Sequence, residues 1–166
     1  MSTDSEIASP ETEAASLIET CAAALEAAED LAGQARAALA DHVTQNGRLD
    51  RAAMEEHQFA CHGLAWIATY VETLRETLGW ARNLQAAGQF GELEQLILQA
   101  GFGEYLAQIA GGIPMAQGEI IRPHDLWISR DALALYQSGA VEALIEAGNA
   151  PDVRSRIAEL IEHGVA

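Results

Sequence analysis

Lysine is absent from the 166-residue sequence, and arginine supplies all nine basic side chains against 25 acidic ones. Without lysine, a Schiff-base mechanism and a lysine-containing phosphate loop are both excluded. The formal net charge of −16 opposes contact with the phosphates of nucleic acids and with anionic lipid headgroups. We therefore expect neither a nucleic acid nor a membrane as a partner.

Long apolar runs are also missing, since the longest one falls far short of the ~20 residues that a membrane helix requires. Residues 1–12 have neither the basic nor the apolar region of a signal peptide, and their composition predicts a disordered acidic tail. Hydrophobic residues make up 49% of the sequence, which is enough to bury a core. These features predict one globular domain over residues 13–163, located in the cytoplasm.

Two long segments, of which the first is alanine-rich, are predicted to form an antiparallel helix hairpin. Apolar residues recur at helical spacing from about Glu11 to Thr44 and from about Arg51 to Ala86. Between them, Gln45-Asn46-Gly47 favours a tight turn, and Asp50 can cap the second helix. Helices of this length indicate an all-α bundle rather than a compact globin-like cluster.

Cys21 and Cys61 are the only cysteines, and neither lies in a motif that marks a nucleophile. In the predicted hairpin they are out of register by roughly 20 Å at 1.5 Å per residue, so no disulfide is expected. Free thiols are typical of a reducing cytoplasm.

The remainder of the chain is predicted to add shorter helices around a crossover. A third helix runs from about Phe90 to Gly111-Gly112, loosened or kinked at Gly101-Phe102-Gly103. Prolines and glycine make residues 113–128 a largely extended connection that can include a short strand. Three final helices follow, with Ser129 as a cap for Arg130–Gln137, Gly148 ending Ala140–Ala147, and Pro151 in the first turn of a helix to about Glu162.

Complete catalytic or metal motifs are not found. The Gly101-x-Gly103 pair lacks the third glycine of a dinucleotide fingerprint, and no histidine has a glutamate three residues before it, as a di-iron bundle requires. His57 and Cys61 could share a metal but supply only two ligands. A polar cluster on the second helix could serve acid–base chemistry or form a solvated face, the latter because adjacent helical positions point in different directions; it comprises Glu55, Glu56, His57 and His62. We expect no metal site and assign no catalytic residue.

Four aromatic residues form a row along the second helix: Phe59, Trp66, Tyr70 and Trp80. This helix has more apolar surface than one packing face needs. We expect part of the row to lie at an interface with a second copy or a partner subunit, where tryptophan and tyrosine are typical anchors. The alternatives are burial in the core and stacking against a planar ring.

The segment from Gly111 to Glu119 has a composition that packing alone explains poorly. Two glycines after a helix allow close backbone approach, and Gly118 allows another sharp turn. One interpretation is a helix stop with a tight crossover. The other is a loop shaped against a partner or ligand.

Two stretches carry a resemblance to a known family: GLAWIATYVE at residues 63–72 and GFGEYLAQIAGGIPM at residues 101–115. They resemble the amino-terminal helical extension of bacterial acyl-CoA dehydrogenases of the (2S)-methylsuccinyl-CoA dehydrogenase type. The resemblance covers about residues 49–151. It implies a flavoprotein body, absent here, that oxidises a branched acyl-CoA to its enoyl-CoA with FAD.

A second, shorter stretch looks like the Gln-x-x-Gly-Gly sequence that lies against FAD in the carboxy-terminal bundle of acyl-CoA dehydrogenases. The likeness implies Gln108, Gly111 and Gly112 as cofactor-binding residues. The family's catalytic glutamate stands in a Tyr-Glu-Gly context, whereas the corresponding stretch here reads His124-Asp125-Leu126-Trp127. The flavin-binding β-domain of the family has no counterpart.

The resemblance thus implies a non-catalytic accessory or assembly domain of an acyl-CoA dehydrogenase, with the flavoprotein body or a second copy as partner and FAD bound outside this chain. The alternative is a free-standing helical regulatory domain that binds an acyl-CoA or another hydrophobic anion. Arg75, Arg82 and Arg122 could meet such an anion, although the net charge opposes it.

Overall fold

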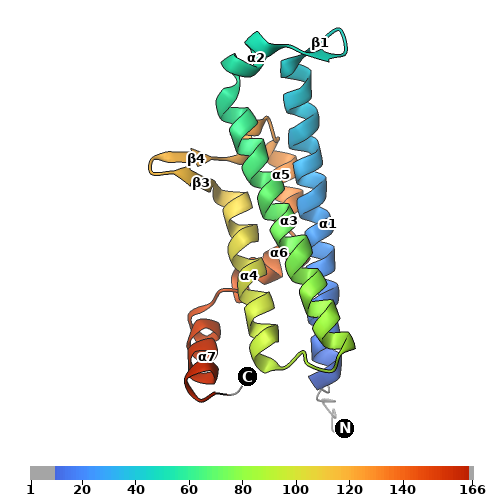
Figure 1. The fold of residues 1–166 in the computed structure, drawn as a ribbon, viewed down its shortest axis with the longest axis vertical. Coiled ribbons are helices and arrows are strands. Elements are labelled where there is room, and N and C mark those ends of the chain that lie inside the picture. Colours follow the sequence, from blue (N-terminus) through green and yellow to red (C-terminus); the bar gives the residue numbers. More distant parts are fainter. Residues whose placement is uncertain (1–9, 165–166) are drawn as a thin grey trace, which may run out of the picture.

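Residues 10–164, the part of the chain that the computed structural model describes, are 77% helical and form seven α-helices (Figure 1). The two longest helices, α1 (Pro10–Val43) and α3 (Gln58–Ala86), run antiparallel along the length of the molecule. The predicted all-α bundle is confirmed. Helix α1 includes the last residues of the segment predicted to be a tail, and residues 1–9 lie outside the described range.

The turn between the long helices is a small hairpin of β1 (Thr44–Gln45) and β2 (Arg48–Leu49). Asn46 and Gly47 both have positive φ, of 52° and 74°, as a two-residue hairpin turn requires. The Asp50 carboxylate then accepts hydrogen bonds from the amides of Ala52 at 2.9 Å and Ala53 at 3.4 Å. The predicted turn and cap are therefore present.

The second long segment is two helices rather than the single one predicted. Helix α2 (Arg51–Glu56) ends at His57, whose φ of −100° and ψ of 25° depart from helical values, and α3 begins at Gln58. The break turns the His57 ring towards the rings of His42 and Trp127, with centroid distances of 5.4 and 5.6 Å. Contacts with residues distant in sequence thus accompany the break in an otherwise helical pattern.

Helix α4 (Glu92–Gly111) is continuous through Gly101-Phe102-Gly103, so the predicted loosening or kink is wrong. Phe102 is fully buried, and Gly103 faces the end of α6 (Ala140–Ala147), where a Cβ atom would lie 2.6 Å from the carbonyl oxygen of Leu144. Gly103 is therefore explained by close helix packing and not by a need for flexibility.

The crossover contains a hairpin of β3 (Ile113–Ala116) and β4 (Glu119–Ile121), followed by the short 3-10 helix η1 (Pro123–Leu126), in keeping with the predicted extended connection. Figure 1 shows this hairpin projecting from the bundle. Helix α5 (Arg130–Tyr136) is capped by Ser129, whose hydroxyl accepts a hydrogen bond from the amide of Ala132 at 3.1 Å. Gly148 ends α6, as predicted.

The last helix, α7 (Pro151–Glu162), lies beside α4 (Figure 1). Arg156 forms a bidentate ion pair with Glu92 on α4, with N–O distances of 2.7 and 2.9 Å. Hydrogen bonding to Arg156 lowers the pKa of the Glu92 carboxyl. This contact supplements the apolar packing of α7, in which Val153 and Leu160 are buried.

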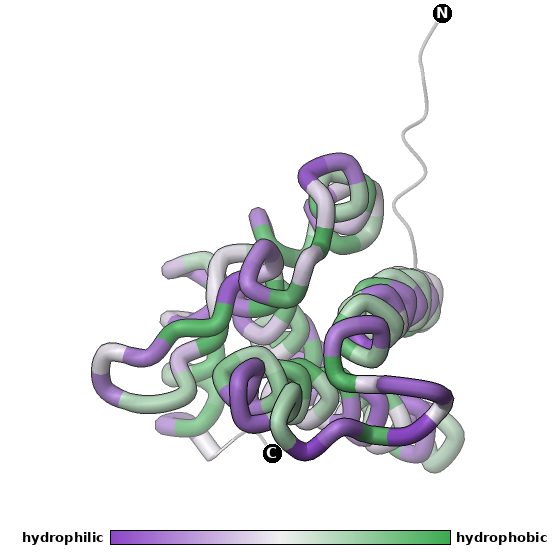
Figure 2. The backbone as a smooth tube through the Cα atoms, turned by 90° about the horizontal axis from the view of Figure 1, so that it is seen from above, coloured by the Kyte–Doolittle hydropathy of each residue, from purple (hydrophilic) through white to green (hydrophobic). Residues whose placement is uncertain are grey.

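The core consists of apolar side chains from α1, α3, α4 and α6, together with Tyr136 of α5 and apolar residues of the crossover. Viewed from above, polar and apolar positions alternate around the helices (Figure 2). The largest fully buried side chains include Phe102, Leu31, Ile67, Leu74, Leu98 and Leu106. No helix within residues 10–164 combines the length and hydrophobicity needed to cross a membrane.

Candidate functional site

A chain of polar contacts surrounds Gln108, the first residue predicted to contact a cofactor. The hydroxyl of Tyr70 on α3 donates to the Gln108 amide oxygen at 2.6 Å, and the amide nitrogen donates to Glu104 at 2.6 Å. Asn149, in the connection between α6 and α7, donates to the other Glu104 oxygen at 2.5 Å. Both polar atoms of Gln108 are thus engaged within the chain, and the network joins α3, α4 and the α6–α7 connection.

Tyr70 is the buried end of this network. Burial, with smaller contributions from Tyr105 and Glu104, raises the pKa of its hydroxyl, which favours the protonated form that donates to Gln108. Its ring also packs edge-on against Tyr105 with a centroid distance of 4.7 Å. Tyr70 therefore contributes to internal packing between α3 and α4.

The two glycines that follow Gln108 differ in their surroundings. Gly112 has a φ of 138°, and a Cβ atom there would lie 2.6 Å from a side-chain carbon of Ile120 on β4. These constraints explain a glycine at the turn from α4 into β3. Gly111 is exposed, and a Cβ atom there would meet nothing within 4 Å. A cofactor role for Gln108, Gly111 and Gly112 stays a prediction.

The predicted aromatic row is only partly at the surface. Phe59 and Trp80 are 40% and 37% exposed, and Trp66 is half-buried, whereas Tyr70 is buried against α4. The Trp66 indole donates to Nε2 of His62 at 2.9 Å and lies edge-on to Tyr70. Phe59, Trp66 and Trp80 therefore remain as the members of the row that can meet a partner.

The polar cluster considered for acid–base chemistry does not converge. His57 turns towards His42 and Trp127, while His62 accepts a hydrogen bond from Trp66. Glu55 pairs with Arg51 one helical turn away. Within residues 10–164, no three His, Cys, Asp or Glu side chains gather in a way that could hold a metal ion.

Sequence reasoning missed an aromatic stack near the end of the bundle. Trp127, just after η1, has a φ of 56° and a ψ of 20°, a left-handed conformation uncommon for a bulky residue. Its ring stacks on His42 from the end of α1, with a centroid distance of 3.9 Å. A left-handed tryptophan has no local sequence signal, because neither glycine nor asparagine marks the position.

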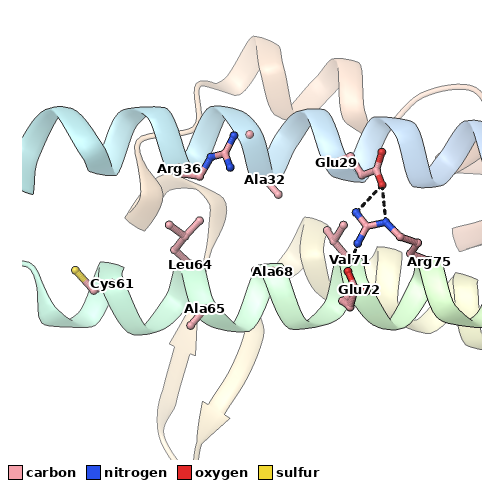
Figure 3. A pocket seen from close by; sticks show the side chains of 11 residues that line it. Glu29, Ala32, Arg36, Cys61, Leu64, Ala65, Ala68, Val71, Glu72 and Arg75 are labelled. Carbon is pink, nitrogen blue, oxygen red and sulfur yellow. Dashed lines mark hydrogen bonds and ion pairs between the residues drawn. The ribbon is translucent and has the colours of Figure 1, made fainter.

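A groove of about 620 Å³ between α1 and α3 was also not predicted (Figure 3). Its apolar lining comes from both helices and comprises Ala32, Gly33, Leu64, Ala65, Ala68 and Val71. Arg36 on α1 borders the groove opposite Leu64, and Arg75 on α3 lies towards the end away from Cys61, between Glu29 and Glu72. The residues that line the groove come from two helices, so the sequence pattern of either helix alone does not predict a groove.

Comparison with known proteins places this geometry in context. No protein-family model matches the chain. It is 49% identical over 145 residues to (2S)-methylsuccinyl-CoA dehydrogenase from Cereibacter sphaeroides. The predicted resemblance is confirmed. The match covers 86% of this chain but 26% of that protein, so the chain spans about a quarter of its relative's length.

The two cysteines lead to a prediction about reactivity. Burial raises the pKa of the Cys21 thiol to about 12, whereas Cys61 is half-buried beside the groove. At pH 8, we expect Ellman's reagent to modify Cys61 alone in the folded protein and both thiols in denaturant. Because the folded-state pKa exceeds the ordinary value of 9.0, the free energy of unfolding should fall as the pH rises from 9 towards 12.

A Cys61→Ser variant is the matched control for this measurement. It should show no rapidly reacting thiol when folded and one thiol when denatured. Two rapidly modified thiols in the unaltered folded protein would contradict the burial of Cys21.

Proposed function

We propose that this chain is a non-catalytic accessory or assembly domain of an FAD-dependent acyl-CoA dehydrogenase that acts in the cytoplasm. The supporting observation is the 49% identity to (2S)-methylsuccinyl-CoA dehydrogenase over 86% of this chain and only 26% of that protein. In the proposal, the remaining part of such an enzyme binds FAD and oxidises the acyl-CoA. This chain corresponds to its amino-terminal helical extension.

The contacts of Gln108 support a structural role over direct flavin binding. Its amide oxygen accepts from Tyr70 and its amide nitrogen donates to Glu104, so contact with a cofactor would have to replace one of these bonds. Gly112 is similarly accounted for by its positive φ and its proximity to Ile120. Two of the three residues that resemble a flavin contact, Gln108 and Gly112, thus have identifiable partners or constraints inside the domain, whereas Gly111 is exposed.

The proposal is tested by attempted reconstitution. The purified chain is mixed with FAD, desalted, scanned in the visible region, and assayed with (2S)-methylsuccinyl-CoA and an artificial electron acceptor. We expect no stoichiometric flavin and no turnover. In parallel, the Cereibacter sphaeroides relative, produced without its matching segment, should form a defined complex with this chain. Turnover by the chain alone, or failure of the two parts to associate, would contradict the proposal.

We propose the exposed part of the aromatic row, which is Phe59, Trp66 and Trp80, as the surface for association with the flavoprotein body or a second copy. Replacing Trp66 with alanine should weaken association about thirtyfold, corresponding to an anchor worth ~2 kcal/mol. Because Trp66 is half-buried, the stability cost should stay below the ~3–5 kcal/mol of a fully buried tryptophan. Sedimentation velocity and thermal melting measure the two effects.

Leu135→Ala provides the control, since Leu135 is 76% exposed on α5 and lies outside the row. It should leave association unchanged. Equal effects of the two substitutions on association, or no effect of Trp66→Ala, would show that the aromatic row is not the interface.

A further inference from the structure

The groove between α1 and α3 has an uneven distribution of charge. At one end, Arg75 is held by two carboxylates: its guanidinium bonds Glu29 at 2.7 and 3.1 Å and also bonds Glu72. These three side chains together carry one negative charge. Towards the other end, opposite Leu64, Arg36 is exposed and forms no ion pair or hydrogen bond with any residue in the described range 10–164. The groove therefore has one uncompensated cation and one net anionic end.

Between these ends, the surface is apolar and open. Leu64 and Val71 lie seven residues apart on α3, which corresponds to roughly 10 Å along a helix. Ala65 and Ala68 are exposed there, and a Cβ atom on Gly33 would meet nothing within 4 Å. Internal packing therefore does not account for the glycine, although glycine within a helix is less favourable than alanine.

We propose that this groove binds an aliphatic monocarboxylate, with the carboxylate on Arg36 and the hydrocarbon chain along Leu64, Ala68 and Val71. The volume of about 620 Å³ lies within the range of small-molecule sites. The charges determine the orientation, because the Arg36 end attracts the carboxylate and the Glu29–Arg75–Glu72 end repels it. This inference does not rest on the proposed function of the chain.

Titration calorimetry with hexanoate, octanoate and decanoate tests the site on the chain as it is. Saturable binding to one site is expected, with affinity rising about fourfold for each added methylene group as more hydrocarbon leaves water. Amide chemical shifts recorded during the titration should change most at Gly33, Ala65 and Ala68. The absence of saturable binding by decanoate, or shifts confined to residues outside the groove, would overturn the proposal.

Two pairs of variants separate charge from shape. Arg36→Gln should weaken octanoate binding about tenfold, as expected for the loss of a charged hydrogen bond, and should leave 1-octanol binding unchanged. Arg82→Gln is its control, because it removes the same charge from an exposed position of α3 outside the groove. Equal weakening by both variants would show a net-charge effect and overturn the assignment to Arg36.

The second pair of variants tests the shape of the groove by adding side-chain volume. Ala68→Leu should block octanoate and 1-octanol alike, whereas Ala143→Leu, at an exposed position of α6, should affect neither. If Ala68→Leu instead changes the sedimentation of the ligand-free chain and leaves carboxylate binding intact, the groove is a contact between copies and the proposed ligand is wrong.

Discussion

Replacing Gly103 with alanine is expected to lower the free energy of unfolding by ~2–3 kcal/mol, which is within the range for overpacking a tight interior. A Cβ atom there would lie 2.6 Å from the carbonyl oxygen of Leu144, 2.9 Å from the Cα of Gly148 and 3.0 Å from the amide nitrogen of Asn149. All three are backbone atoms, so no side-chain rotation can relieve the contact. Helices α4 and α6 must move apart.

Gly101→Ala is a closely matched control, two residues away on the same helix. A Cβ atom at Gly101 would meet nothing within 4 Å. Because alanine is a better helix former, this variant should gain ~0.5–1 kcal/mol. Chemical denaturation of the two variants should therefore give changes of opposite sign. A loss of stability for both would mean that the segment needs glycine for backbone freedom rather than for close packing.

The Gly103→Ala substitution should also disturb the polar network around Gln108. Asn149 donates to Glu104 at 2.5 Å across the α4–α6 contact that Gly103 permits. Separation of the helices would stretch this bond and free one Glu104 oxygen. The side-chain amide resonances of Asn149 and Gln108 should therefore shift in Gly103→Ala and remain in place in Gly101→Ala.

Phe102→Ala is expected to cost ~3–5 kcal/mol, the largest effect of any single substitution considered, because it removes a fully buried ring and leaves a cavity. The helix itself should tolerate the change, since alanine favours helical conformation. The loss arises from apolar surface returned to water and from contacts that neighbouring helices cannot restore. Equilibrium denaturation in urea measures it directly.

Phe59→Ala removes the same side chain from a surface position and serves as the comparison. Phe59 is 40% exposed and belongs to the proposed interface, so its removal should cost ~1 kcal/mol or less in the isolated chain. If the two phenylalanine variants lose similar stability, the burial of Phe102 in the core is contradicted.

Sequence patterns were sufficient for the helical architecture because helix boundaries depend on residues close together in the chain. Asp50 and Ser129 cap helices with side-chain oxygens that reach amides two or three residues away. Asn46 and Gly47 adopt positive φ by their intrinsic preferences, and Pro151 begins α7 because its missing amide is not needed there. These positions were predicted correctly.

Tertiary structure alone decided the features that depend on contacts between distant residues. Gly101 and Gly103 look equivalent in sequence, yet only Gly103 meets the backbone of α6, some 40 residues later. The sequence places Tyr70 in the aromatic row expected at an interface, but in the fold its hydroxyl donates a hydrogen bond to Gln108, 38 residues away. Likewise, the groove required two helices to lie side by side before Arg36 could border the apolar face of α3. A linear pattern records which face of a helix is apolar, but the element that covers that face is chosen by packing between segments.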